Sequence, residues 1–345
     1  MKYDVHFYKP DQLPEIEAEW HLLEQGVEMT YYQTYIWHQL LNRCYLPVDT
    51  SHYVSRYAVV RNNGQAVLIA PLWICLHRFR WVNYQGVFLI GRETWSDYVN
   101  FIYDNFDGDA LLSCLCAVVE EFHVDYFCFD KMKNDTSAYS YLVEQRSAVV
   151  RNTEICAMLR LPDTIDNYDK MLSKNARQNL RTARNRLERN NIELQIDIDD
   201  KHVNREQCEL IRSQRLERLK PQVCWLRRKK WQLMRSLEFH FPSFSVIREF
   251  DQSHFLTIKH GSVLCAFFNY IYDEDHHQIL VMTAGVNSDY AWYSPGMLGM
   301  YYFICRHIEV HDVEIIDFTR GNEPYKYVLG CKNHLISSVS LRFSK

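Results

Sequence analysis

The sequence predicts a mixed α/β protein built from two domains in tandem. A length of 345 residues suggests about two domains of ordinary size. A hydrophobic content of 47%, with only 11 Gly and 9 Pro, is typical of a folded globular chain. Helix-like and strand-like segments alternate, and a similar order of elements occurs in each half. We therefore expect one domain at residues 1–152 and a second at residues 153–345.

The first half reads as helices, paired strands, a helix and a strand. Residues 12–25 and 33–43 have apolar positions at helical spacing. The run RYAVVRNNGQAVLIAPLWICLHRF predicts two strands joined by a tight turn at Asn62-Asn63-Gly64. The strand WVNYQGVFLIG, the helix GDALLSCLCAVVEEF and the strand VDYFCFD follow. These elements describe one compact mixed domain.

The second half has the same character behind an extra basic helical block. After the strand CAMLRL we expect one long helix, DNYDKMLSKNARQNLRTARNRLERNN, and the strand IELQIDI. Two more helices are predicted in REQCELIRSQRLERL and CWLRRKKWQLMRSLEFHF. Three or four antiparallel strands run from FSVIREF to VMTAGVN, with turns at His260-Gly261 and at residues 273–276. A helix over Met297–Glu309 and the strand VEIIDF complete the domain.

Composition argues against several classes of protein. A net charge of -4 gives no overall field that favours nucleic acid or a membrane surface. We find no signal-peptide pattern and no run of 18 apolar residues. The eleven Cys are odd in number and form no Cys-x-x-Cys, which indicates buried thiols in a reducing cytoplasm. His276-His277 has no matching Cys/His pair, so we expect no metal.

The stretch AWYSPGMLGM contains a predicted helix start. Ser294 stands at the N-cap position, Pro295 at the first helical position and Gly296 directly after it. Backbone amides and the helix dipole at such a start hold phosphates, and Gly296 permits close approach. Many ordinary helices also begin with Ser-Pro, so this start alone does not define a site.

The loop after the last predicted strand carries an unusual density of ionisable side chains. Within IIDFTRGNEPYKYVLG, Arg320 and Lys326 supply positive charge, Glu323 is able to accept a proton, and Tyr325 is able to donate one. The alternative is a self-contained salt-bridge network that caps the last strands. Asp317, just inside the strand, fits equally well as a buried acceptor for backbone amides.

Two further groups of residues are candidates for substrate contacts. Asp97, Tyr98 and Asn100 follow a strand and a Gly-containing turn, although an Asx-type turn with a core aromatic explains them too. Lys174 and Arg177 begin a row of bases on one face of the basic helix. Such a row is either a solvated face or a contact for a polyanion.

Four segments together resemble a known family. YSPGMLGMYYF, EIIDFTRGNEPYKYVLG, MLSKNARQNLRTARNRLER and WSDYVNF resemble the CelD-type branch of the GNAT N-acetyltransferase superfamily, which is associated with bacterial cellulose and exopolysaccharide biosynthesis. The resemblance covers most of residues 90–335. It implies two GNAT-like acyl-CoA N-acyltransferase domains in tandem, as in the Fem-type aminoacyl transferases.

The resemblance also implies an acetyl-CoA or other acyl-CoA donor. Its pantetheine arm would lie in the gap between two splayed strands, beside VMTAGVN, with its phosphates at the helix start. The implied donor-site residues are Thr283, Ala284, Gly285, Ser294, Pro295, Gly296, Met297 and Gly299. The turn lacks the leading basic residue of the general GNAT pattern, and Pro295 removes one amide donor. Another activated acyl group therefore stays open as the donor.

The implied reaction is acyl transfer to an amine or hydroxyl of a small metabolite or a polysaccharide precursor. Glu323 or Asp317 would serve as the base and Tyr325 as the acid. The implied substrate contacts are Asp97, Tyr98, Asn100, Arg320, Lys326, Lys174 and Arg177. Two alternatives remain: a Fem-type transferase whose basic helix contacts aminoacyl-tRNA, and a non-catalytic binding or scaffold protein of a polysaccharide locus.

Overall fold

The computed structural model describes residues 3–44, 49, 53–76, 86–91, 96–124, 126–219 and 253–342. The chain divides into two compact units. The first unit contains Met1–Ile155 and His334–Lys345, and the second contains Cys156–Asn333. The sequence predicts all of residues 153–345 in the second domain. The last strand is instead part of the first unit, because it pairs along the strand Tyr126–Lys133.

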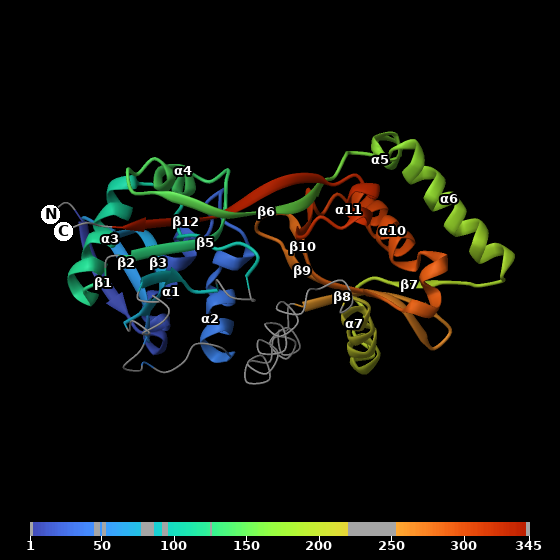
Figure 1. Cartoon of the computed structure of the whole chain (residues 1–345), viewed down its shortest axis with the longest axis horizontal. Helices are drawn as coiled ribbons and strands as arrows, with labels where there is room; N and C mark the ends of the chain where they lie inside the picture. The colour runs from blue at the N-terminus through green and yellow to red at the C-terminus, as the bar shows by residue number, and fades with distance from the viewer. Residues whose placement is uncertain are drawn as a thin grey trace. The chain divides into compact units, whose positions relative to one another are not determined.

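The first unit contains six strands that are neighbours in a larger sheet. In sheet order they are β1 (Tyr3–Tyr8), β2 (Tyr53–Asn62), β3 (Gln65–Cys75), β4 (Gly86–Leu89), β5 (Tyr126–Lys133) and β12 (Lys332–Arg342). Its helices are η1 (Pro10–Ile16), α1 (Glu17–Leu23), η2 (Tyr31–Gln33), α2 (Tyr35–Cys44), α3 (Gly108–Phe122) and α4 (Ser137–Val143). All neighbouring strands are antiparallel except β4 and β5. Figure 1 shows the red strand β12 beside β5.

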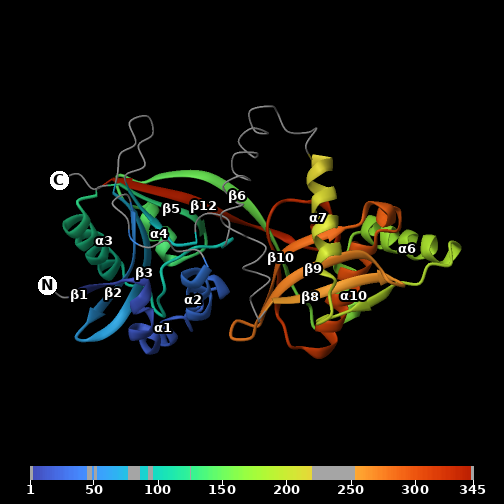
Figure 2. The same cartoon turned by 90° about the horizontal axis from the view of Figure 1, so that it is seen from below.

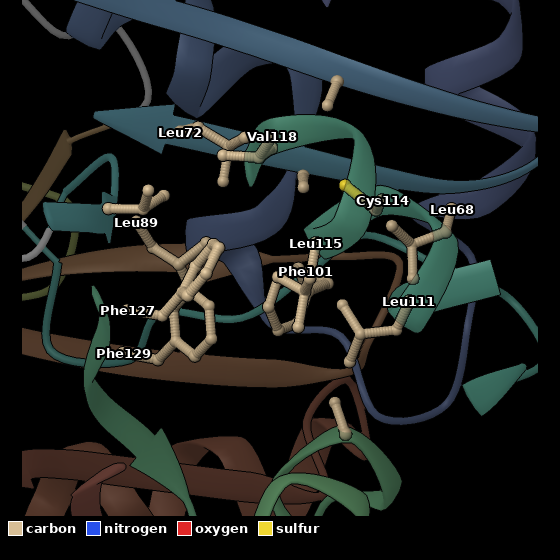
Figure 3. Packing of buried hydrophobic residues seen from close by; sticks show 14 of the residues in the cluster. Leu68, Leu72, Leu89, Phe101, Leu111, Cys114, Leu115, Val118, Phe127 and Phe129 are labelled. Atoms are coloured by element: carbon tan, nitrogen blue, oxygen red, sulfur yellow. The ribbon is translucent and has the colours of Figure 1, made fainter. Parts of the chain in front are cut away.

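Helix α3 fills the core on one face of this sheet. It begins because the Asp107 carboxylate accepts hydrogen bonds from two first-turn amides, and it ends at His123 in the left-handed conformation. Its apolar side chains recur at helical spacing and face the strands and three phenylalanines in Figure 3. The labelled members are Leu111, Cys114, Leu115, Val118, Leu68, Leu72, Leu89, Phe101, Phe127 and Phe129. On α1, Trp20 packs instead on Tyr57 of β2, at 5.4 Å between ring centroids.

The second unit contains six further strands, of which β6 begins in the first unit. In sheet order its strands are β6 (Val149–Arg160), β11 (Ile315–Arg320), β10 (Gln278–Val286), β9 (Val263–Asp273), β8 (Ser253–His260) and β7 (Gln195–Asp197). Its helices are α5 (Ile165–Met171), α6 (Lys174–Arg189), α7 (Arg205–Leu219), η4 (Ser288–Tyr293), α10 (Pro295–Val310) and α11 (Pro324–Val328). Among the described strands of this unit, β10 and β11 pair in parallel and the other ladders are antiparallel.

Helices cover both faces of the strands of the second unit. Side chains alternate between faces along a strand. On β9, Phe268 accordingly joins the core that contains α10, while its neighbour Phe267 packs with Ile211 of α7. Figure 2 shows β8, β9 and β10 side by side. These strands therefore form a middle layer between α10 and α7, and β10 and β11 lead into the loops that carry the candidate residues.

Several predicted elements are confirmed. The hairpin turns at Asn63 and Gly64, both of which have positive φ, and the helices predicted for 108–122, 205–219 and 297–309 are present. The mixed α/β class is confirmed as well. The helix predicted in CWLRRKKWQLMRSLEFHF and the strand FSVIREF lie outside the described residues.

Three predictions about elements need correction. The helix expected over residues 12–25 opens as the 3-10 segment η1, which contains Pro14, a residue without an amide donor. The single long basic helix is two helices, because Leu172 is extended and the Ser173 hydroxyl caps a new start by accepting the Ala176 amide. The strand β12 was not predicted at all.

Candidate functional site

The parallel strands β10 and β11 pair over only three residues. The ladder joins Gln278 to Ile315 and ends where Leu280 faces Asp317. Both strands continue beyond that point, β10 to Val286 and β11 to Arg320, without further ladder pairs between them. The sheet therefore splits between two neighbouring strands in its interior.

A kink in β11 explains where the ladder stops. The Asp317 carboxylate, 2% exposed, accepts a hydrogen bond from the Thr319 amide at 2.7 Å. Thr319 has a left-handed backbone, with φ of 54°, which is unfavourable for a β-branched residue. Its hydroxyl donates to the Val281 carbonyl of β10 at 3.2 Å. The side chains of Asp317 and Thr319 thus hold the strand out of regular pairing, as predicted for Asp317 under the buried-acceptor alternative.

Strand β10 has an irregularity of its own at the same level. Val281 faces Tyr270 of β9 and Thr283 faces Asn269, so Met282 is an extra residue in β10. Such a bulge changes the direction of the backbone groups next to it. The predicted donor residues Thr283 and Ala284 follow directly and are half-buried. The predicted strand beside a thioester is therefore a bulged strand next to the split.

Helix α10 begins as the sequence predicts, but Ser294 acts differently from a usual cap. Ser294 is the N-cap and Pro295 the first helical residue, yet the Ser294 side chain makes no capping hydrogen bond. Its backbone is left-handed, with φ of 52°, because the chain leaves η4 there. The amides of the first turn have no partner within the helix. Gly296 and Met297 supply the first two, since Pro295 has none.

The glycines predicted at the donor site have close neighbours of their own. A Cβ on Gly299 would lie 2.3 Å from Cγ1 of Ile258, so α10 crosses β8 at this residue. A Cβ on Gly285 would lie 2.7 Å from Cγ2 of Ile211. On Gly296 the nearest atom would be the Cγ2 of Val286, at 3.0 Å, and the next nearest, on Phe268 and Ala266, lie at ordinary contact distance. Close packing thus accounts for Gly299 and Gly285 without a ligand.

Lys326 forms the centre of the ionisable loop. It lies on α11, is 2% exposed, and its Nζ donates to the carbonyls of Phe318, Arg320 and Gly321, each at 3.0 Å. The same Nζ forms an ion pair with Glu323 at 3.0 Å. The charge of Lys326 is therefore used within the loop, as in the predicted self-contained network.

Other contacts fix the outer part of this loop. Gly321 has φ of 109°, and a Cβ there would lie 2.5 Å from the Glu323 carboxylate. Tyr168 of α5 donates its hydroxyl to the Leu329 carbonyl at 3.0 Å, and burial raises the pKa of that phenol, which keeps it a donor. Glu323 keeps a side-chain exposure of 38%, and Tyr325 is half-buried. Carboxylate and phenol thus stand at the surface of an internally fixed loop.

A thiol also lies close to this loop. Cys331 is 7% exposed, and burial raises its pKa to about 12. A thiol of that pKa remains protonated at neutral pH, which argues against a cysteine nucleophile here.

The basic helix makes several internal contacts. Arg177 donates to the carbonyls of Asp169 and Leu172, which closes the end of α5. Arg184 lies over the ring of Tyr301, 5.3 Å from its centroid. Lys174 is exposed at the helix start. The predicted row of bases is therefore only partly directed to solvent, and its role towards a substrate stays a prediction.

The candidates from the first half lie in the first unit. Tyr98 is 1% exposed and its hydroxyl pairs with Nε2 of His334 at 2.9 Å. Asn100 donates to the Tyr103 hydroxyl and accepts from the Phe101 amide. Asp97 is half-buried. The other predicted site residues all belong to the second unit.

Two residues that stabilise the second-unit site were not predicted from the sequence. Thr319 and Tyr168 were not singled out, although they hold the kink and the loop. A Thr between Phe and Arg carries no signal of a left-handed backbone, and Tyr168 was predicted to be part of one long helix.

Among the described residues no group of three potential metal ligands occurs. None of the helices described is long and apolar enough to span a membrane.

The second-unit site thus combines a split between parallel strands, a bulge in β10 and a helix start that follows β10 and η4. Residues 174–327 match the family model described as an acetyltransferase (GNAT) domain. This stretch contains β10, α10, β11 and most of α11, and so nearly all of the second-unit site. The predicted resemblance to GNAT domains agrees with this match over residues 174–327, whereas the CelD-type branch stays a prediction.

Solved structures extend the similarity to the whole chain. FemX is 9% identical, with a TM-score of 0.63 over 99% of this chain and 97% of that chain. A tandem GNAT protein from the clavulanic acid biosynthesis pathway is 9% identical, with a TM-score of 0.52 over 99% of both. A conserved protein of unknown function from Bacteroides thetaiotaomicron is 12% identical, with a TM-score of 0.53 over 99% of this chain and 100% of that chain. The tandem GNAT-like fold is confirmed. No curated protein sequence matches this chain.

Proposed function

We propose that the second unit transfers an acetyl or other acyl group from acyl-CoA to an amine or hydroxyl of a small metabolite or a polysaccharide precursor. The observation that carries this proposal is the split after Leu280 and Asp317, together with the start of α10, which β10 reaches through the short segment η4. A split between strands gives a thin, extended pantetheine arm a place to lie along strand backbone. A helix start at its end supplies amides and a positive dipole for phosphates.

The donor is proposed to lie along β10. The thioester carbonyl would accept a hydrogen bond from the backbone between Thr283 and Gly285, where charge develops in the transition state. The amides of Gly296 and Met297 would bind the pyrophosphate. Pro295 provides no amide, so fewer donors meet the phosphates here than at an ordinary helix start. Ala284 and Gly299 would shape the channel through packing.

The acceptor is proposed to enter beside the loop that follows β11. Glu323 takes a proton from the acceptor amine or hydroxyl, the acceptor attacks the thioester carbon, and Tyr325 protonates the sulfur as the carbon–sulfur bond breaks. We assign the base to Glu323 because its side chain is 38% exposed, whereas Asp317 is buried and its carboxylate accepts the Thr319 amide. Lys326 holds the loop, and Arg320 orients the acceptor. Positioning of the acceptor against the thioester would supply much of the rate.

A change of charge at Ser294 tests the donor site without removing the helix start. Asp and Asn both tolerate the left-handed backbone of this residue, and both are good N-caps. Ser294→Asp places a carboxylate where the phosphates would bind, while Ser294→Asn is its neutral match. By isothermal titration we expect Ser294→Asp to weaken acetyl-CoA binding at least about tenfold and Ser294→Asn to stay within about threefold, because like charges repel most at low salt. Equal affinities for both variants would contradict the proposed phosphate position.

The similarity to FemX and the exposed base Lys174 favour a second candidate, a transferase that uses aminoacyl-tRNA. In that case the protein binds no acyl-CoA, and its binding to aminoacyl-tRNA weakens steeply with added salt. Binding to neither donor would support the non-catalytic binding protein instead.

A further inference from the structure

Trp292, the fifth residue of η4, is an exposed aromatic residue with a fixed position. Its side chain is 64% exposed, although large aromatic residues are normally well buried. Arg186 of α6 lies over its ring, with the guanidinium carbon 3.6 Å from the ring centroid. The same arginine donates from Nη1 to the Trp292 carbonyl at 2.8 Å. One side chain therefore holds both the backbone and the indole of Trp292.

This arrangement prepares an aromatic surface for a ligand. The guanidinium covers one face of the indole, and the high exposure of the side chain means that most of its surface remains in contact with solvent. A side chain that is already held in place loses little conformational entropy when a partner stacks on it. Planar, electron-rich rings such as nucleobases stack on indoles without requiring a particular set of hydrogen bonds.

The surroundings of Trp292 supply positive charge as well. Arg186 uses one of its five guanidinium hydrogens for the Trp292 carbonyl. Arg189 follows one helical turn later on α6 and is exposed. These two cations come from a different element than the donor turn, whose own sequence has no basic residue at its head. Guanidinium groups bind phosphate with paired hydrogen bonds.

The position along the chain connects this surface with the donor. Trp292 stands two residues before Ser294, and so just ahead of the turn proposed for the pyrophosphate. The part of CoA beyond the pyrophosphate is an adenosine with a 3′-phosphate. We propose that Trp292 stacks on the adenine of the CoA donor and that Arg186 and Arg189 bind its 3′-phosphate. This inference rests on the proposed function, since it concerns the outer end of the same donor.

The test compares CoA with two shortened ligands, 3′-dephospho-CoA and 4′-phosphopantetheine, by isothermal titration of the full chain. For Trp292→Ala we expect CoA to bind about 5- to 100-fold more weakly, the range that base stacking gives. Binding of 4′-phosphopantetheine, which has no adenosine, should stay within about twofold because nothing is left to stack. Trp292→Phe should recover most of the loss. Arg186→Gln should reduce the preference for CoA over 3′-dephospho-CoA.

Tyr302→Ala is the matched control. Tyr302 is 43% exposed and lies near a guanidinium of α6, that of Arg184 at 5.5 Å, but it stands in the middle of α10. We expect its removal to leave all three affinities unchanged. An equal loss of CoA and 4′-phosphopantetheine in Trp292→Ala, or no loss of either, would overturn the adenine assignment while the proposed function stands. Failure of the unsubstituted protein to bind any of the three ligands would overturn both.

Discussion

Replacement of Lys326 by Met should destabilise the second unit by about 3 kcal/mol. The side chain is 2% exposed, and its ammonium donates to three carbonyls at 3.0 Å. Hydrogen bonds to a charged group contribute about 1.5–3 kcal/mol each, and the cost of burying the ammonium offsets part of that sum. The pair with Glu323 adds little, because the carboxylate is 38% exposed and screened by water. Met keeps the length of the side chain and leaves three carbonyls and the carboxylate without their donor.

The assay is urea unfolding followed by far-UV circular dichroism, with Lys332→Met as the control. Lys332 is an exposed lysine of β12, and its replacement should change the free energy of unfolding by less than about 0.5 kcal/mol. Turnover should fall at least about tenfold in Lys326→Met, while the affinity for acetyl-CoA stays within about threefold, because the loop and not the donor turn is loosened. If Lys326→Met were as stable as Lys332→Met, the account of the loop as held from within would be refuted.

Three further outcomes follow from individual contacts. Burial lowers the pKa of His38 from 6.5 to about 3, so between these pH values the unfolded chain binds a proton that the native chain does not. The free energy of unfolding should therefore fall by about 1.4 kcal/mol per pH unit from pH 6.5 towards pH 3. In urea unfolding, the variant His38→Gln should lack this pH dependence. Gly299→Ala should cost about 1–3 kcal/mol through its clash with Ile258, and a double variant with Ile258→Ala should be more stable than the sum of the two single costs predicts; additive costs would contradict the clash. Asp317→Asn should retain activity within about threefold, whereas Glu323→Gln should lose about 100-fold or more; the reverse order would move the base to Asp317.

The sequence predicted those parts of the fold that depend on local chemistry. Asn63-Gly64 defines a hairpin turn because both residues adopt positive φ easily. The helix start at Ser294-Pro295 follows from the fixed φ of proline. Such features depend on neighbouring residues in the sequence and not on tertiary packing. They therefore allow the position of the proposed donor turn along the chain to be predicted.

The contacts that the sequence did not predict are tertiary. A lysine in a polar segment such as that of Lys326 is normally expected to be exposed to solvent. Lys326 is buried because the backbone of the loop turns around its side chain. Arg186 meets Trp292 across about a hundred residues of chain, with no pattern that links the two. β12 has no apolar alternation because Ser337, Ser338 and Ser340 occupy buried positions in it.

The strand β12 has a consequence for the order in which the protein folds. It pairs Ser340 with Cys128 of β5, which closes a loop of about 200 residues that contains the entire second unit. The second unit is continuous in sequence, so on the ribosome it is able to form as soon as its own residues have emerged. The first unit must wait, with the edge of β5 uncovered, until the last strand is synthesised. The unit that begins the chain is thus the last to be completed, and a ribosome-bound chain that stops before His334 should expose an unfinished sheet edge to chaperones.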